Sequence, residues 1–320
     1  MKKTNTSKAK ETGKAKVDTY QMVTDRIIAE LESGVVPWHK PWSGISTGAY
    51  NVVRKVPYSF INQLMLRHSG AYASYNQWAT LAKKQNPDKV KAKQWAGGVK
   101  GNEKGEKVVF WKPIPVKETD KDGNEVTKFI PFLKYDTVFH ISQVEGVTLP
   151  EIPKEEHDPI PEAEKIISDY AARETITMED VVGDRAYYSP SRDYLCVPAK
   201  EQYKALEEYY STKFHAMIHS TGHVSRLDRF SGKNANAHFG SEVYSKEELI
   251  AEIGAANLMF SCGIETEKTF KNSAAYIQSW LNALKNDKKL IVTAAGKAEK
   301  AVKYILNGKT EKEDNDNEEE

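Results

Sequence analysis

The segment His215-Ala216-Met217-Ile218-His219 places two histidines four residues apart, and this spacing decides how the C-terminal half of the chain is interpreted. Residues four apart on an α-helix lie on one face, about 6 Å apart along the axis. Two imidazoles so placed can hold one Zn²⁺ ion from the same side. In H-E-x-x-H peptidases the residue after the first histidine is a glutamate that deprotonates metal-bound water. Because Ala216 cannot accept a proton, the sequence predicts a metal site without hydrolytic activity.

The helix around the two histidines is predicted independently by its apolar residues. Pro198, with an acidic residue in the turn that follows, is typical of a helix start, and Gly222 is typical of a helix end. Apolar residues recur at three- and four-residue steps in between, at Tyr203, Leu206, Tyr210, Phe214, Met217 and Ile218. Two core or surface histidines can also fall four apart without binding metal, so a third ligand is needed.

The next predicted helix supplies that third ligand. Ser245 is expected to begin this helix with Glu248 at the capping-box position, and Glu248 and Glu252 are again four residues apart. Two histidines and one glutamate form the His₂Glu set of catalytic zinc sites. We expect Glu248 to bind the metal and Glu252 to accept an imidazole N–H; the reverse assignment also fits the spacing. His223, eight residues after His215, is an alternative ligand.

Length and composition favour a two-domain protein of the cytoplasm. The chain has 320 residues, long enough for two ordinary domains. No stretch approaches eighteen apolar residues, so no membrane span is predicted. The basic N-terminus lacks the apolar segment of a secretory signal. Cys196 and Cys262 are the only cysteines, which favours a reducing compartment without a disulfide framework.

Charge is divided unequally along the chain, although the net charge is only +1. Residues 1–150 carry 24 Lys and Arg against 14 Asp and Glu, and the remaining residues carry 22 against 31. This asymmetry points the first half toward a polyanion. The predicted organisation is a disordered basic tail at 1–16, a first domain at 17–150, a Pro- and acid-rich linker at 151–161, a second domain at 162–307 and a disordered acidic tail at 308–320.

The basic half also contains five of the six tryptophans. Aromatic rings stack on unpaired bases while Lys and Arg follow the phosphates, a combination that suits single-stranded DNA better than a duplex. The alternative is that many of these rings are core residues. The candidate DNA contacts, chosen by residue type, are Trp38, Lys40, Trp42, Arg54, Lys55, Tyr58, Asn62, Trp78, Lys107 and Trp111.

Two long motifs carry a resemblance to a known family. The segment KFHAMIHSTGHVSRLDR, followed by FGSEVYSKEELIAEIGAANL, resembles the zincin-like domain of ArdC-type antirestriction proteins. The upstream segments YQMVTDRIIAELESGVVPWHKPW, KGEKVVFWK and LKYDTVFHISQVEG are similar to the N-terminal, single-stranded-DNA-binding module of that family. Ala216 is the one sharp departure. It marks either a natural protein that has lost hydrolysis or a replacement of the glutamate in an active one.

The resemblance implies an α+β fold with two domains, an α+β single-stranded-DNA-binding domain followed by a mainly helical zincin-like metallopeptidase domain. It further implies a mobile-element protein that shields incoming single-stranded DNA, binds one Zn²⁺ per chain and has an unidentified protein or peptide substrate. Two hypotheses remain open. The first is a metallopeptidase domain inactivated through Ala216, and the second is a DNA-shielding protein whose zinc is purely structural.

Overall fold

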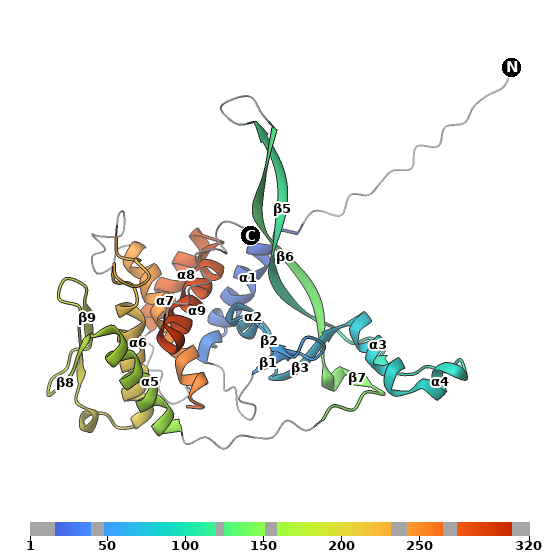
Figure 1. The fold of residues 1–320 in the computed structure, drawn as a ribbon, viewed down its shortest axis with the longest axis horizontal. Coiled ribbons are helices and arrows are strands. Elements are labelled where there is room, and N and C mark those ends of the chain that lie inside the picture. The colour runs from blue at the N-terminus through green and yellow to red at the C-terminus, as the bar shows by residue number, and fades with distance from the viewer. Residues whose placement is uncertain are drawn as a thin grey trace.

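The structure is a computed structural model that describes residues 17–39, 48–119, 125–150, 159–231, 242–264 and 274–308 (Figure 1). The DNA candidates Lys40 and Trp42 lie outside these residues. So do the predicted tail at 1–16, the linker up to residue 158 and the tail from residue 309. Pro159, Ile160 and Pro161, which we had expected in the linker, belong to a helix instead.

The C-terminal half is a bundle of helices with a small sheet at one side (Figure 1). The helices are α5 (Pro159–Glu174), α6 (Leu206–Ser220), α7 (Glu242–Ser261), α8 (Ala274–Asn286) and α9 (Leu290–Asn307). The sheet has the order β8-β10-β9, formed by β8 (Thr177–Val181), β9 (Tyr187–Ser189) and β10 (Tyr194–Pro198). Strand β10 pairs parallel with β8 and antiparallel with β9.

The N-terminal half combines short helices with a five-stranded sheet of order β2-β1-β3-β6-β5. Its strands are β1 (Ala49–Asn51), β2 (Val56–Pro57), β3 (Gly70–Ser74), β5 (Glu106–Thr119) and β6 (Glu125–His140). Strands β4 (Gly98–Val99) and β7 (Val144–Glu145) form a separate pair. The helices are α1 (Thr19–Glu32), α2 (Phe60–Met65), α3 (Tyr75–Gln85) and α4 (Pro87–Lys91), and the short 3₁₀ turns are Pro37–His39, Ile141–Gln143 and Lys200–Gln202.

The two halves share one hydrophobic core. Helices α1 and α2 lie beside α8 and α9 in Figure 1, and both contact α9. The core that contains Val23 and Ile27 of α1 also contains the buried residues of α6, α7 and α9. Trp38 packs edge-on against Trp280, with ring centroids 5.3 Å apart. The charge boundary near residue 150 therefore does not separate two independent cores.

Two predicted helix starts are wrong. Helix α6 begins at Leu206 and not near Pro198, which is the last residue of strand β10. Tyr203, between the two, has extended backbone angles and is not helical. Helix α7 begins at Glu242, so Ser245 lies inside the helix and is not its N-cap. The apolar periodicity predicts the helices themselves correctly, because the buried face of α6 includes Phe214, Met217 and Ile218.

Strands β5 and β6 form a long hairpin that projects away from the helices (Figure 1). In this part of the sequence, apolar residues mark strands near 107–112 and 135–141, but ladder pairing continues from Glu106↔Val138 to Thr119↔Glu125. Most residues in its outer part are exposed on both faces. Alternation of buried and exposed side chains, which marks a half-buried strand, therefore stops before the strands do.

Candidate metal centre

Helices α6 and α7 approach each other closely because small residues line their contact. Gly254 on α7 faces Ile218 on α6, and a Cβ atom at Gly254 would lie 2.7 Å from the Ile218 side chain. Ala251 beside it is fully buried. Because the two helices are this close, polar side chains of α6 and α7 beside this contact lie within reach of one another.

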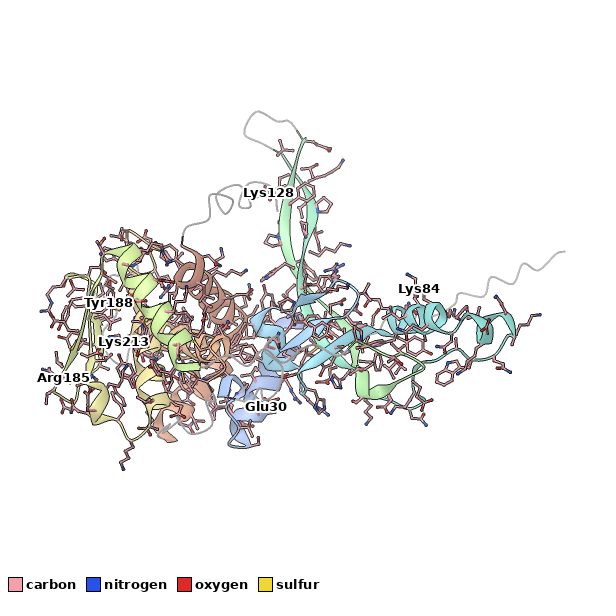
Figure 2. All side chains as sticks on the ribbon, turned by 60° about the horizontal axis from the view of Figure 1, so that its bottom comes forward. Glu30, Lys84, Lys128, Arg185, Tyr188 and Lys213 are labelled. Atoms are coloured by element: carbon pink, nitrogen blue, oxygen red, sulfur yellow. The ribbon has the colours of Figure 1, made fainter. Side chains whose placement is uncertain are left out.

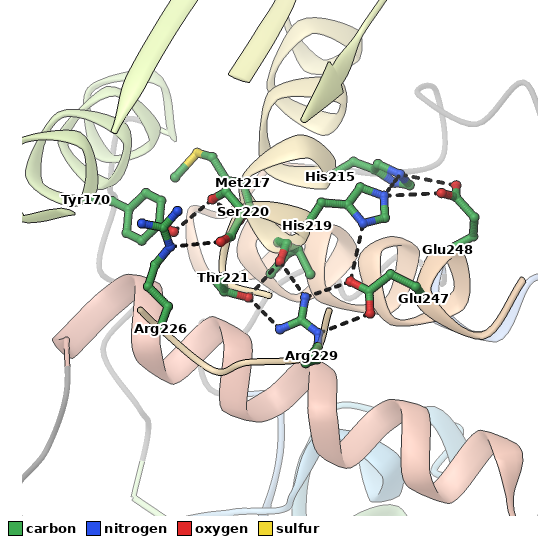
Figure 3. A network of polar contacts seen from close by, with 11 residues as sticks. Tyr170, His215, Met217, His219, Ser220, Thr221, Arg226, Arg229, Glu247 and Glu248 are labelled. Atoms are coloured by element: carbon green, nitrogen blue, oxygen red, sulfur yellow. Dashed lines mark hydrogen bonds and ion pairs between the residues drawn. The ribbon is translucent and has the colours of Figure 1, made fainter. Parts of the chain in front are cut away.

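Three side chains converge where these helices meet (Figure 3). The Nε2 atoms of His215 and His219 lie 3.0 Å apart. Carboxylate oxygens of Glu248 lie 3.5 Å from His215 Nε2 and 3.3 Å from His219 Nε2. The three ligand atoms all lie within 4.8 Å of one another, and no other group of this kind occurs among the described residues.

These separations fit a metal ion held by all three side chains. Ligand atoms at 2.0–2.1 Å from a tetrahedral ion are about 3.3 Å apart along each edge of the tetrahedron. The two Nε2 atoms are 3.0 Å apart, and each lies close to that edge length from one oxygen of Glu248, His215 from Oε2 at 3.5 Å and His219 from Oε1 at 3.3 Å. Three ligands on one face of a tetrahedron leave a fourth position for water or substrate.

The outer nitrogen of each imidazole faces a second carboxylate. Glu252 Oε1 lies 3.3 Å from His215 Nδ1, as expected for a residue that accepts the imidazole N–H. Glu247 Oε1 lies 3.3 Å from His219 Nδ1. A carboxylate at Nδ1 places the ring proton there and leaves the Nε2 lone pair of each histidine available for a cation.

Glu247 is a residue of the site that the sequence pattern did not predict. Arg229 donates to both of its oxygens, from Nη2 at 2.7 Å and from Nε at 3.1 Å. The same guanidinium donates to Thr221 Oγ1 at 2.7 Å and to the Ile218 carbonyl at 2.8 Å (Figure 3). Arg229 thus ties Glu247 to the end of α6. The position of Glu247 next to Glu248 could have indicated this role, because neighbouring helix positions can face two histidines that are one turn apart.

Proton affinities in the site follow from this pairing. Burial favours a neutral His215, but the carboxylates of Glu248 and Glu252 outweigh burial and raise the pKa of His215 to about 10. Burial also favours a neutral His219, but Glu247 and Glu248 favour its charged form more strongly, so the pKa of His219 is raised as well. Burial would raise the pKa of Glu248, but the two imidazoles lower it below its ordinary value. The site therefore favours a cation between its carboxylates.

A second polar network holds the end of α6 against the small sheet. Arg226 forms a bidentate ion pair with Asp193, with its Nη1 atom 3.1 Å from Asp193 Oδ2, and donates from Nε to the Ser220 carbonyl at 2.8 Å. Tyr170 of α5 shares a 2.8 Å hydrogen bond with the Ser220 hydroxyl. The turn after His219 is therefore fixed from two sides, which restrains the second histidine.

Ala216 and His223 lie beside this centre in different ways. Ala216 is buried in the core at the helix position that follows His215. His223 lies beyond the end of α6, where its Nδ1 lies 2.8 Å from the Ser225 hydroxyl. His223 does not belong to the described group of converging ligand atoms, so its alternative assignment as a ligand has no geometric support.

Three of the predicted DNA contacts are core residues, and those predictions are corrected. Trp38 and Trp78 are fully buried, and the Trp78 indole donates to the Phe139 carbonyl at 2.8 Å. Asn62 is buried too, and its amide pairs with both backbone groups of Val109 at 2.7 and 2.8 Å. None of these side chains presents a surface on which a base could stack.

The other described candidates lie at or near the surface. Arg54 and Lys55 are exposed in the turn between β1 and β2, and Trp111 of the hairpin is 53% exposed. Tyr58 is partly buried, with an edge-on contact to the Tyr72 ring. Lys107 is also partly buried, and its amino group donates to the Thr137 hydroxyl at 2.6 Å. These five residues remain predictions, with Arg54, Lys55 and Trp111 the most accessible.

Two histidines on one helix and a glutamate on the next define a zincin-like metal-binding domain. Residues 161–297 match the family model of a zincin-like metallopeptidase, and residues 17–139 match that of the N-terminal domain of anti-restriction factor ArdC. The metal-free crystal structure of the antirestriction protein ArdC from plasmid R388 is 34% identical, with a TM-score of 0.67, and the alignment covers 91% of this chain and 98% of that one. The chain therefore belongs to the ArdC-like antirestriction family.

Further relatives differ in length. Uncharacterized protein y4eC of Sinorhizobium fredii is 32% identical over 90% of this chain and 91% of its own length. DNA primase TraC of Escherichia coli is 33% identical over 90% of this chain, which spans only 20% of that protein. The Mn(II)-bound structure of the R388 protein aligns with a TM-score of 0.68 and the same 34% identity. Among the described helices, none combines the length and apolar character needed to cross a bilayer.

Proposed function

We propose that this chain is a mobile-element antirestriction protein that binds single-stranded DNA and one Zn²⁺ ion, and that Ala216 leaves its zincin-like domain without peptidase activity. The observation that carries the proposal is the convergence of two Nε2 atoms and one carboxylate within 4.8 Å, directly beside a position that lacks a proton acceptor. The solved relative with Mn(II) bound supports a divalent ion in this family.

His215, His219 and Glu248 would hold the ion. A zincin-type ion polarises a peptide carbonyl and lowers the pKa of its bound water. Glu252 and Glu247 would orient the two imidazoles through their Nδ1 atoms, at the 3.3 Å separations described above. In active members of the H-E-x-x-H class, a glutamate in the position of Ala216 takes the proton from the water. The methyl group of Ala216 has no such capacity, so peptide hydrolysis stops at proton removal.

Binding of single-stranded DNA is supported by the distribution of charge and exposed side chains. The family implies this partner, and residues 51–112 carry 12 Lys and Arg against 3 Asp and Glu. Cations follow the phosphates of any strand, whereas exposed aromatic rings favour unpaired bases. A protein of this kind would coat incoming single-stranded DNA in the cytoplasm of a recipient cell.

Restoring the glutamate tests the silenced peptidase. Ala216→Glu should gain zinc-dependent cleavage of an unstructured protein such as casein, or of the chain itself. A general base contributes roughly 10²- to 10⁴-fold in rate, so the gain should be of that order. Cleavage would be followed by gel and mass spectrometry, with bound zinc measured by elemental analysis on the same samples.

Two variants control this experiment. Ala216→Gln introduces the same volume without a base, so it should keep the metal and remain inactive. His219→Ala in the Ala216→Glu background should lose both the metal and the cleavage. If Ala216→Glu binds one zinc per chain and cleaves nothing, the second hypothesis gains support, namely a DNA-shielding protein in which zinc only stabilises the fold.

A further inference from the structure

The β5–β6 hairpin forms a two-stranded arm on which several large apolar side chains are exposed. Phe110 is 45% exposed, Phe132 38% and Ile130 43%, although each lies within a paired strand. The arm extends beyond the rest of the molecule with side chains projecting from both of its faces, as Figure 2 shows around Lys128. Apolar side chains exposed together on one surface are a feature of binding surfaces.

The register of the hairpin sorts these side chains onto two faces. Residues directly opposite each other in an antiparallel pair lie on the same face, with Cβ atoms about 5 Å apart. Phe110 is opposite Lys134, and Lys112 is opposite Phe132. Because the side-chain period of a strand is two, both pairs lie on one face. Each phenylalanine thus has a lysine across the ladder and another two residues along its own strand. We call these four residues the Phe/Lys face.

The charges of the Phe/Lys face suit an anionic partner. Within the described residues, neither Lys112 nor Lys134 forms an ion pair with a carboxylate. Toward the tip of the same face, Lys128 is paired with Glu118 at 3.9 Å. Toward the base, two more carboxylates lie on this face, Asp136 opposite Val108 and Glu106 opposite Val138. The two lysines that have no carboxylate partner among the described residues therefore lie on the same two rungs of the hairpin as the two rings.

The opposite face of the hairpin has another composition. Trp111 and Leu133 are paired there, and near the base this face is covered by α1, where Tyr20 contacts Trp111 edge-on at 6.2 Å. Farther out it carries Phe129, which is 56% exposed, and Lys117, whose amino group is bound to Glu125 at 3.0 Å. This face has apolar surface with little free charge.

We propose that the Phe/Lys face of the hairpin is the surface on which single-stranded DNA lies, an inference that rests on the DNA binding proposed above. The phenylalanine rings stack on unpaired bases while Lys112 and Lys134 contact the flanking phosphates. Stacking needs bases that are not already stacked in a duplex, so the rings select single strands and the lysines attract any nucleic acid. The arm holds the strand away from the metal centre.

The experiment compares two double variants of the full chain with the wild type. Binding to a labelled oligothymidylate and to a duplex of the same length is measured by fluorescence anisotropy over a range of salt concentrations. Phe110→Ala/Phe132→Ala should weaken binding to the single strand by at least about tenfold, since each stacked ring contributes roughly 1–3 kcal/mol. Its affinity for the duplex should stay within about twofold of wild type.

Lys112→Ala/Lys134→Ala should weaken binding to both nucleic acids. Each lost phosphate contact reduces the slope of log affinity against log salt by about 0.7 for a single strand, so the pair should reduce it by roughly 1.4. The matched control is Phe129→Ala/Lys117→Ala, which removes the same residue types from the opposite face. This control should bind oligothymidylate as the wild type does.

The outcomes separate this inference from the proposed function. If both Phe/Lys-face variants bind DNA as tightly as the wild type, the assignment of the face is overturned and DNA binding stays in place. The same conclusion follows if the control variant loses as much affinity as they do. Failure of the wild type to bind oligothymidylate overturns both. Concentration-dependent dimers that disappear only in the Phe/Lys-face variants, with DNA binding intact, would assign the arm to contact between two copies of the chain. Melting temperatures close to wild type show that the variants are folded, because all the substituted residues lie outside the core.

Discussion

The metal centre and the β5–β6 hairpin use charged side chains in opposite ways. At the centre, Glu247, Glu248 and Glu252 each face an imidazole nitrogen, and Arg229 is bound to Glu247. On the Phe/Lys face, Lys112 and Lys134 have no carboxylate partner among the described residues. A closed set of partly buried charges fixes positions to a few tenths of an ångström, which an ion requires. Open charges on an exposed ribbon attract a long, variable polymer.

The contrast extends to the core beneath each region. The centre lies above a core to which both halves of the chain contribute, including Trp38 and Trp280. The outer part of the hairpin has almost no core of its own. Substitutions in the shared core should therefore disturb the metal site and the global stability together, whereas substitutions on the arm should change binding alone.

The largest expected effect tests whether the two halves are one folding unit. Trp38→Ala removes a fully buried ring that contacts Trp280. The change should reduce the free energy of unfolding by about 3–5 kcal/mol. Chemical denaturation followed by circular dichroism and by metal release should show one transition at lower denaturant for both signals. Two separated transitions, with metal release unaffected, would contradict the shared core.

A smaller effect is expected at the ion pair that holds the end of α6. Burial alone would raise the pKa of Asp193, but Arg226 and Tyr188 outweigh it and lower the pKa below the ordinary 3.8. A lowered pKa contributes stability that is present at neutral pH and is lost as the pH falls through the folded-state value. Asp193→Asn should therefore cost about 2 kcal/mol at pH 7, less than for a fully buried pair because Asp193 is partly exposed.

The pH dependence provides the control for this prediction. The difference in unfolding free energy between wild type and Asp193→Asn should begin to shrink as the pH falls below about 4, near the unfolded-state pKa of an aspartate, and should vanish only below the lower folded-state pKa, where the carboxylate is protonated in both states. Urea denaturation at several pH values, with a chelator present throughout, measures it without interference from the metal. A difference that stays constant down to pH 2 would show that the ionised carboxylate is not the cause.

The most local effect, on metal affinity alone, concerns the orientation of His219. Glu247→Gln keeps the volume but weakens the hydrogen bond to His219 Nδ1 and the ion pair with Arg229. Loss of such an outer contact commonly lowers metal affinity by about 10- to 100-fold. Competition with a chromophoric chelator measures the affinity, and the visible spectrum of the Co²⁺-substituted protein reports the ligand geometry. Glu201→Gln, at an exposed acid in the 3₁₀ turn before α6 that is not among the converging residues, should leave both unchanged.

Much of the metal centre could be predicted from local spacing. His215 and His219 share a helical face because four residues make about one turn, and the same rule relates Glu248 to Glu252. Glu247 was missed because its role depends on Arg229, which reaches it from the loop after α6. Nothing in the spacing of the α7 residues indicates that a guanidinium lies there. Three of the predicted DNA contacts were wrong, because residue type does not distinguish a buried tryptophan or asparagine from an exposed one.

The sequence by itself determined the helices, the histidine and glutamate faces, the unequal distribution of charge and the family. All of these depend on residues close together in the chain or on composition. Only the tertiary structure decided that Trp38, Trp78 and Asn62 are internal, that the halves share a core, and that Phe110 and Phe132 lie on one exposed face with two lysines. Burial depends on contacts between residues far apart in the sequence, as between Trp38 and Trp280, and such contacts leave no periodic trace in either segment.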